Sequence, residues 1–208
     1  MKVTDNITIT NEDNMELMAR YPDNHFDLAI VDPPYRDSNQ PTKDMRANGS
    51  MVSLEGRPTI KYFKELYRVS KNQIIWGANN FQLPQFKGFF AWDKGIPFDF
   101  TMSMCEIASL SEGLATISKM WKFRIAGAEA RIHPTQKPVQ LYSKLLDTYA
   151  KEGDKILDTH LGSGSIAIAC HNRKFNLTAC ELDKEYFDAS IKRIKQQTAQ
   201  TTIFDLGA

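Results

Sequence analysis

The chain of 208 residues has little cysteine, no long apolar run and almost no net charge. Its three cysteines, Cys105, Cys170 and Cys180, lie far apart, which excludes a disulfide framework or a Cys-x-x-Cys metal site and is typical of a reducing compartment. No apolar run approaches the roughly 20 residues that span a bilayer, and the N-terminus lacks the apolar segment of a signal peptide. We therefore expect a cytoplasmic protein with no membrane segment and no metal site.

The composition is that of an ordinary globular protein, with 42% hydrophobic and 25% charged residues. This length predicts one α/β domain over residues 1–208. The net charge of +1 excludes a strongly basic protein, but basic residues concentrate between 119 and 137, at Lys119, Lys122, Arg124, Arg131 and Lys137. Such a run is usually a solvated face, and it is also what a surface that binds phosphates needs.

A buried strand ends at a stiff polar turn in the run Asp32-Pro33-Pro34-Tyr35. The preceding residues 27–31 are apolar on both faces of the expected strand, which is typical of a parallel sheet. Two consecutive prolines fix φ twice and remove two N–H donors, so the strand cannot continue. Ligands of open α/β sheets bind beyond the C-terminal ends of the strands, so this turn is predicted to face a pocket. The alternative is a plain proline turn with a capping Asp32.

A second motif, Asp158 to Ser165, lies between a predicted strand at 155–159 and a predicted helix at 166–172. Glycines at such a turn let the backbone approach a ligand, and the helix N-terminus offers free N–H groups. Glu181 ends the next predicted strand, where a carboxylate can accept hydrogen bonds from ribose hydroxyls. Alone, this pattern suits NAD, a flavin or S-adenosylmethionine.

The order of the two motifs favours one arrangement. Few residues follow Gly164, so the remaining strands must come from the earlier part of the chain. This puts the strand that ends at Asp158 beside the strand that ends at Asp32, with both turns opening on one crevice. Helices are predicted at 59–68, from Pro138 as a first helical residue, and at 184–196. We expect a mobile loop at 36–58, which lacks periodicity, and assign no element to 111–132.

Four motifs in this order resemble one known family. Asp32-Pro33-Pro34-Tyr35, 133–138, 158–165 and Glu181-Leu182-Asp183 are similar to those of the β-group, permuted amino-methylating DNA methyltransferases. The segments 73–77 and 92–94 also match stretches common in that family. The resemblance implies a single Rossmann-like α/β methyltransferase domain with permuted motif order, a mostly parallel sheet flanked by helices, and S-adenosylmethionine as cofactor.

The resemblance assigns the chemistry to the first motif. The exocyclic amine of adenine is a poor nucleophile, so an enzyme must accept hydrogen bonds from it, and Asp32 and the Pro33 carbonyl are the expected acceptors on a turn that Pro34 stiffens. Removing a base from the duplex costs a few kcal/mol, and stacking on Tyr35 returns about 1–3 kcal/mol. In the family, Asp at the first position accompanies adenine N6, whereas Ser accompanies cytosine N4.

The resemblance also implies a cofactor site across the Gly162–Gly164 turn, with Glu181 on the ribose and Asp158 or Asp32 on the ammonium group. Asp13 is expected near the cofactor adenine, with a helix N-cap as the alternative. The chain departs from the family at Thr159 and His160, where Pro and Phe are usual, and we interpret His160 as a packing or hydrogen-bonding residue. Ser163 in the turn is a further cofactor candidate. So are His133, Thr135, Gln136 and Lys137, for which the alternative interpretation is an extended linker.

The chain has no room for a separate target-recognition domain, so DNA reading is expected from 36–57 and 111–132. The candidates for DNA contact are Arg36, Lys43, Arg46, Lys122, Arg124 and Arg131. Members of the family often form homodimers, and 200–204 has the Gln-x-x-aliphatic-Phe pattern of peptides that bind bacterial sliding clamps. The leading interpretation is a DNA adenine-N6 methyltransferase. Four others stay open: the same chemistry on cytosine N4, an RNA or protein-amide methyltransferase, a non-catalytic methyltransferase-like DNA-binding subunit, and a nicotinamide oxidoreductase.

Overall fold

A computed structural model describes residues 1–35, 38–39, 54–101, 103–123, 131–133 and 135–205, with backbone alone at 38–39, 54–55 and 200–205. In these residues a nine-stranded sheet has the order β1-β2-β11-β10-β3-β6-β8-β7-β9. Strands β2, β11, β10, β3 and β6 are mutually parallel, and β6, β8 and β7 pair antiparallel. The strands are β1 Lys2–Thr4, β2 Ile7–Asn11, β3 Phe26–Val31, β6 Ser70–Trp76, β7 Gly88–Asp93, β8 Cys105–Leu110, β9 Lys119–Lys122, β10 Lys155–Asp158 and β11 Asn176–Glu181.

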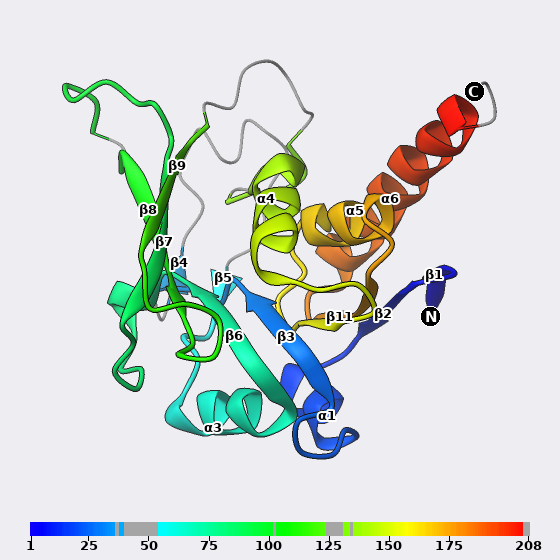
Figure 1. Cartoon of the computed structure of the whole chain (residues 1–208). Coiled ribbons are helices and arrows are strands. Elements are labelled where there is room, and N and C mark those ends of the chain that lie inside the picture. The colour runs from blue at the N-terminus through cyan, green and yellow to red at the C-terminus, as the bar shows by residue number, and fades with distance from the viewer. Residues whose placement is uncertain (36–37, 40–53, 102, 124–130, 134, 206–208) are drawn as a thin grey trace.

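Helices cover both faces of the sheet (Figure 1). Helices α1 (Asn14–Ala19) and α3 (Ile60–Val69) lie on one face, and α4 (Val139–Tyr149), α5 (Ser165–Asn172) and α6 (Lys184–Asp205) lie on the other. A 3-10 turn, η1, spans Ala78–Asn80. Strand β3 is apolar from Leu28 to Val31 because both of its faces are buried there. Its Leu28 and Ile30 belong to one core, and Ala29 and Val31 belong to the other.

The predicted adjacency of the two motif strands is confirmed. Strand β10 pairs in parallel with β3, with Ile156 opposite Leu28 and Leu157 opposite Ala29. Parallel neighbours end at the same edge of a sheet, so Asp32, just after β3, and Asp158, the last residue of β10, lie at that edge. The sheet thus has the arrangement on which a shared crevice depends.

Four expectations need correction or refinement. Pro138 is the N-cap of α4, not its first helical residue, because its ψ of 146° is extended while its carbonyl accepts the Leu141 N–H at 3.1 Å. Helix α6 continues past 196 to Asp205, since no Gly or Pro interrupts it. The region 111–132 contributes β9, which pairs in parallel with β7. Of the expected loop 36–58, β4 (Ser38–Asn39) and β5 (Leu54–Glu55) pair antiparallel, and 36–37 and 40–53 lie outside the described residues.

None of the helices in the described part of the chain is both long and apolar enough to cross a bilayer.

Candidate functional site

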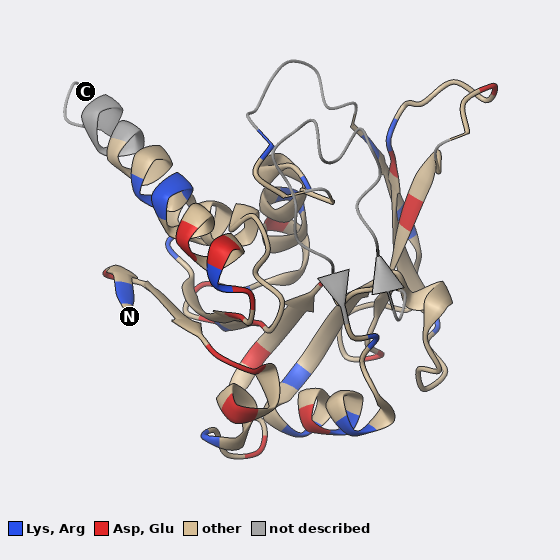
Figure 2. Cartoon of the chain, turned by 180° about the vertical axis from the view of Figure 1, so that it is seen from behind, with Lys and Arg blue, Asp and Glu red and all other residues tan. Residues whose placement is uncertain are grey.

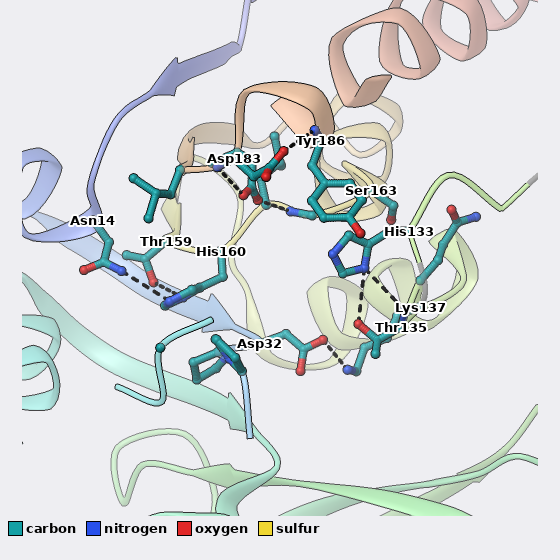
Figure 3. Close-up of a pocket in the computed structure, with 18 of the residues that line it drawn as sticks. Asn14, Asp32, His133, Thr135, Lys137, Thr159, His160, Ser163, Asp183 and Tyr186 are labelled. Carbon is teal, nitrogen blue, oxygen red and sulfur yellow. Dashed lines mark hydrogen bonds and ion pairs between the residues drawn. The ribbon is translucent and has the colours of Figure 1, made fainter. Parts of the chain in front are cut away.

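A pocket of about 760 Å³ opens where β3 and β10 end, a volume within the range of small-molecule sites (Figure 3). Five segments from distant parts of the sequence supply most of its lining, to which Gly56, Glu106, Tyr142 and Tyr186 add single side chains or backbone. The five segments are 12–14 before and at the start of α1, 32–35 after β3, 133 and 135–137 before α4, 159–163 after β10, and 181–184 at the end of β11. The structure therefore brings both sequence motifs to one cavity.

Asp32 uses its two carboxylate oxygens differently. Its Oδ1 accepts the Tyr35 O–H at 2.7 Å, and its Oδ2 forms an ion pair with the Lys137 ammonium group. Burial raises the pKa of Tyr35 far above its ordinary value, so the phenol keeps the proton that it donates. The Tyr35 ring lies on Gly77, where φ is +67° and an added Cβ would come within 2.2 Å of the ring. Glycine is therefore required at this position for the ring to fit.

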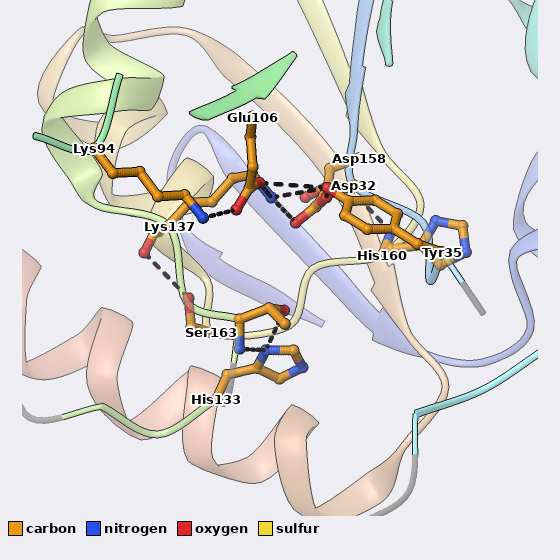
Figure 4. A network of polar contacts seen from close by, with 11 residues as sticks. Asp32, Tyr35, Lys94, Glu106, His133, Lys137, Asp158, His160 and Ser163 are labelled. Carbon is orange, nitrogen blue, oxygen red and sulfur yellow. Dashed lines mark hydrogen bonds and ion pairs between the residues drawn. The ribbon is translucent and has the colours of Figure 1, made fainter. Parts of the chain in front are cut away.

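Lys137 is a buried cation between two carboxylates (Figure 4). Its side chain is 3% exposed, and its Nζ lies 3.1 Å from Glu106 Oε2 as well as beside Asp32. Glu106 Oε1 pairs in turn with Lys94 Nζ at 2.5 Å. Burial opposes the charge of Lys137, but Asp32 and Glu106 outweigh burial and raise its pKa. For Glu106, burial is outweighed by Lys137 and Lys94, which lower its pKa to about 2.

Sequence reasoning gave no role to Glu106, although it lines the pocket. The available signal was a single carboxylate within the otherwise uncharged strand Cys-Glu-Ile-Ala-Ser-Leu of β8. Charged side chains in a strand of a packed sheet need a partner, and that partner was not evident from the order of residues.

Backbone N–H groups of the turn after β10 and of the end of β11 hold the carboxylate of Glu181, the candidate ribose ligand. The Gly162 N–H donates to Glu181 Oε2 at 2.8 Å, and the Asp183 N–H donates to Oε1 at 3.0 Å. Both oxygens keep a second lone pair, so Glu181 can accept further hydrogen bonds from a ligand. Gly164 lies under the turn instead. Its φ is +76° and a Cβ there would approach Ile194 Cδ1 of α6 within 2.8 Å, so glycine serves helix packing.

Asp158, which was expected as a partner of a ligand ammonium group, also lies under the pocket. It is 2% exposed, is not among the described residues that line the cavity, and accepts the His160 N–H at 3.0 Å. Burial, with the charges of Asp32 and Glu181, raises its pKa to about 8. A largely protonated carboxyl attracts a cation only weakly.

His160 belongs to a chain of hydrogen bonds that crosses the cofactor side of the pocket (Figure 3). Its Nε2 lies 3.2 Å from Asn14 Nδ2, its Nδ1 lies 2.9 Å from Thr159 Oγ1, and Thr159 Oγ1 lies 2.7 Å from the Tyr62 hydroxyl. Burial lowers the pKa of His160 to about 3, so the ring is neutral near pH 7. Asp13 caps α1 through the Met15 N–H at 2.8 Å and lines the pocket as well, so its two predicted roles are compatible.

The segment before α4 forms another wall. His133 lies with its ring centroid 4.4 Å from that of Tyr186, and its Nδ1 contacts Thr135 Oγ1 at 3.2 Å. Burial and the Lys137 charge lower the pKa of His133 to about 4. Gln136 is buried and accepts the Ile132 N–H at 3.1 Å. Ser163, at the opposite wall, is buried with its hydroxyl 3.1 Å from that of Ser165.

The candidates for DNA contact are only partly described. Lys122 is 73% exposed and 3.9 Å from Asp93, and Arg131 is exposed. Arg36, Lys43, Arg46 and Arg124 lie outside the described residues. Lys137 does not belong to a phosphate-binding face, because it is buried. In Figure 2, Lys and Arg are spread over many elements of the described chain.

The charges around the cavity fit a cationic ligand. The acidic side chains of the lining are Glu12, Asp13, Asp32, Glu106, Glu181 and Asp183, against the basic Lys137 and Lys184. S-Adenosylmethionine carries a sulfonium and an ammonium group, so its charge suits this lining. Within the described part of the chain no three His, Cys, Asp or Glu residues converge as metal ligands.

Comparisons with known proteins bear on the family and the fold of this chain. The family model of DNA methylases, N6_N4_Mtase, matches residues 102–192. The type II methyltransferase M.HpaI of Haemophilus parainfluenzae is 29% identical over 88% of this chain and 72% of its own length. The solved complex of M1.HpyAVI with SAM has a TM-score of 0.60 at 19% identity and covers 89% of this chain and 98% of that one. PvuII cytosine-N4-specific DNA methyltransferase has a TM-score of 0.62 at 12% identity, over 95% and 93% of the two chains.

At these identities the solved structures bear on the fold, and they match the α/β architecture described above. The family model and M.HpaI bear on the sequence. The family model covers β10 and α5, which carry the glycine turn between them, and the match to M.HpaI extends across most of the chain. The resemblance drawn from the four motifs is thus confirmed. The chain is similar to the S-adenosylmethionine-dependent DNA amino-methyltransferases, the enzymes that methylate adenine N6 or cytosine N4, over residues 102–192 in the family model and over 88% of its length in M.HpaI.

Proposed function

We propose that this enzyme transfers the methyl group to the exocyclic N6 amine of an adenine flipped out of DNA. One observation carries the choice of base: the run Asp32-Pro33-Pro34-Tyr35 faces the pocket that the glycine turn also lines. In the family, Asp at the first position accompanies adenine and Ser accompanies cytosine. The fold alone does not decide, because PvuII methyltransferase, which is cytosine-N4-specific, has a similar one.

The amine of the flipped base donates its two N–H bonds to Asp32 Oδ1 and the Pro33 carbonyl. Accepting both bonds draws the nitrogen toward a tetrahedral form and makes its lone pair available for attack. The two prolines hold these acceptors in place, since neither φ can rotate. The proton that the amine loses leaves to solvent, so the neutral His160 is not needed as a base.

Tyr35 has two roles in this proposal. Without a base, its hydroxyl occupies Asp32 Oδ1 at 2.7 Å, so the acceptor is not left without a partner. The incoming amine takes that position, and the released ring stacks on the base. Phe81, whose ring centroid lies 6.1 Å from that of Tyr35, bounds the space in which the ring turns.

The cofactor supplies an activated methyl group bound to a sulfonium. On the chain's side, Glu181 accepts hydrogen bonds from the ribose hydroxyls, Asp13 and His160 border the adenine end, and Gly162 and Ser163 let the backbone approach. Asp32 and the 133–137 segment enclose the methionine end. Each of these residues lines the pocket except the undescribed Pro134.

Transfer of a labelled methyl group from S-adenosylmethionine to DNA, followed by nucleoside analysis, tests the proposal. We expect label in N6-methyladenine. Label in N4-methylcytosine contradicts the choice of base, and label in RNA or protein but not in DNA contradicts the choice of acceptor.

We further propose that the enzyme acts in the cytoplasm on DNA held by Lys122, Arg131, Arg36, Lys43, Arg46 and Arg124. Homodimer formation is checked by light scattering of the purified chain. Binding to a sliding clamp through 200–204 is checked by a pull-down with purified clamp that is lost on Phe204→Ala. The backbone at 201–205 is helical in α6, so clamp binding through an extended peptide requires the end of that helix to unwind.

A further inference from the structure

We propose that Glu106 is a positioning residue for methyl transfer, which holds the Lys137 ammonium group against one oxygen of Asp32 and so fixes the other oxygen toward the amine. The inference rests on the function proposed above. It concerns a residue of β8 that lies outside the four motifs and that the chemistry so far has not used.

The geometry joins three elements through one cation. Asp32 follows β3, Glu106 is the second residue of β8, and Lys137 precedes α4. Lys137 Nζ contacts Asp32 Oδ2 and lies 3.1 Å from Glu106 Oε2. The three side chains are 15%, 22% and 3% exposed, in the order Asp32, Glu106, Lys137. Figure 4 shows them together with Lys94 at the other oxygen of Glu106.

Each oxygen of the two carboxylates has its own partner. Glu106 Oε1 takes Lys94 and Oε2 takes Lys137, while Asp32 Oδ2 takes Lys137 and leaves Oδ1 for a neutral donor. The charges alternate from Lys94 through Glu106 and Lys137 to Asp32. This alternation allows all four charged groups to coexist away from bulk water, where an unpaired one would be strongly destabilising.

Aromatic rings limit where the ammonium group can go. Lys137 Nζ lies 5.1 Å from the ring centroid of the fully buried Trp76 and 5.9 Å from that of Tyr35. With both rings in place, the two carboxylates define the position of the cation. Removing Glu106 leaves Asp32 as its one close carboxylate partner among the described residues, so the ammonium group moves and the Asp32 carboxylate turns with it.

The titratable groups around Lys137 are known, so a pH readout can be interpreted. Asp32 and Glu106 contact it directly, the Tyr35 hydroxyl lies 3.4 Å away, His133 and Asp158 feel its charge, and Lys94 holds the other oxygen of Glu106. Of these, Glu106 is a carboxylate that raises the pKa of Lys137 and does not itself meet the amine. Its loss makes Lys137 release its proton at lower pH.

The test compares Glu106→Gln, which keeps the shape but not the charge, with the wild-type enzyme on adenine-containing duplex DNA. We expect kcat to fall about 10- to 100-fold, as displacements near 1 Å do at other sites. The KM for S-adenosylmethionine should stay within about threefold, and the alkaline limb of the kcat profile should move to lower pH. Glu106→Asp, which restores the charge, should return that limb toward the wild-type position.

The matched control is Glu65→Gln, which removes a half-buried carboxylate from the ion pair with Arg68 at 2.8 Å and should leave rate and pH profile unchanged. Thermal unfolding checks that each variant is folded. If Glu106→Gln is not, Glu106→Asp carries the kcat test, because its carboxylate is one methylene shorter and should lower kcat while the alkaline limb stays near its wild-type position. If the wild-type enzyme is active and Glu106→Gln has the same kcat and the same pH profile, the inference about Glu106 is wrong and the proposed function stands. A wild-type enzyme that methylates no DNA base overturns the proposed function and the inference with it.

Discussion

At the scale of single residues, the account depends on one oxygen atom of Asp32. Lys137 occupies Oδ2, so the proposed reaction assigns Oδ1 and the Pro33 carbonyl to the amine. Asp32→Ala removes the first acceptor. The loss of one preorganised electrostatic contact typically costs about 10²–10³ in kcat, so turnover should fall at least that far. Calorimetry should still detect most of the cofactor affinity, because the glycine turn and Glu181 are unchanged.

The control for Asp32→Ala is Asp23→Ala, which removes an exposed carboxylate at the surface ion pair with Arg68. Equal turnover in Asp32→Ala and wild-type enzyme would refute the acceptor role.

His160 makes a separate prediction about stability and pH. Its pKa is about 3 in the folded chain, below the ordinary value of 6.5, so the unfolded chain binds the extra proton between these pH values. The stabilisation of the folded chain by the neutral His160 ring is therefore fully present above pH 6.5. It decreases as the pH falls from 6.5 toward 3, and the free energy of unfolding decreases with it. The slope reaches at most about 1.4 kcal/mol per pH unit.

Urea unfolding of wild-type and His160→Asn protein at several pH values measures this slope. Because its pKa is raised, Asp158 makes the free energy of unfolding increase as the pH falls from about 8 to 4, opposite to the effect of His160. Both proteins keep Asp158, so its contribution cancels when their free energies of unfolding are subtracted. Parallel stability profiles of the two proteins would show that His160 is not buried as a neutral ring.

At the scale of elements, Gly164 tests how α5 and α6 pack. An alanine there meets two penalties, a φ of +76° and a Cβ within 2.8 Å of Ile194. Gly153 has a φ of +86° with no atom within 4 Å of the added Cβ, so Gly153→Ala meets only the first. The backbone penalty is about 1–2 kcal/mol in both. Overpacking adds about 1–3 kcal/mol for Gly164→Ala, which chemical denaturation can detect.

Equal losses in the two glycine variants would mean that α6 does not press on the turn. That result would return Gly164 to the role expected from its sequence, a backbone that approaches the cofactor.

The elements themselves could be predicted because their signals are local. Strand β3 is read from an apolar run and two prolines, and the turn before α5 from glycines after a strand. The pairing of β3 with β10 follows from chain order, since too few residues remain after Gly164 to complete a sheet. The end of α6 could not be predicted, because loss of apolar periodicity does not end a helix that lacks Gly and Pro.

The candidate site was predictable only in part, for a physical reason. Residues inside the motifs line the pocket, but the ion pairs of Glu106, Lys94 and Lys137 join side chains that are far apart in sequence. Which charged side chains form such ion pairs depends on tertiary packing. The same holds for Asp158, whose burial under the turn, not its place in a motif, raises its pKa to about 8.

At the scale of the whole molecule, the described chain joins both halves of the site in one sheet. In the proposed reaction, DNA supplies the base and the pocket at the ends of β3 and β10 receives it. The acidic lining of this pocket repels phosphate groups, so this proposal keeps the DNA backbone at the rim while the base alone enters.

The most direct test is sequencing of the methylome of cells that express the protein, beside cells that express Asp32→Ala. The account predicts N6-methyladenine at a short recurring sequence in the first cells and none above background in the second. Methylation at cytosine N4, or the same adenine methylation with Asp32→Ala, would contradict it.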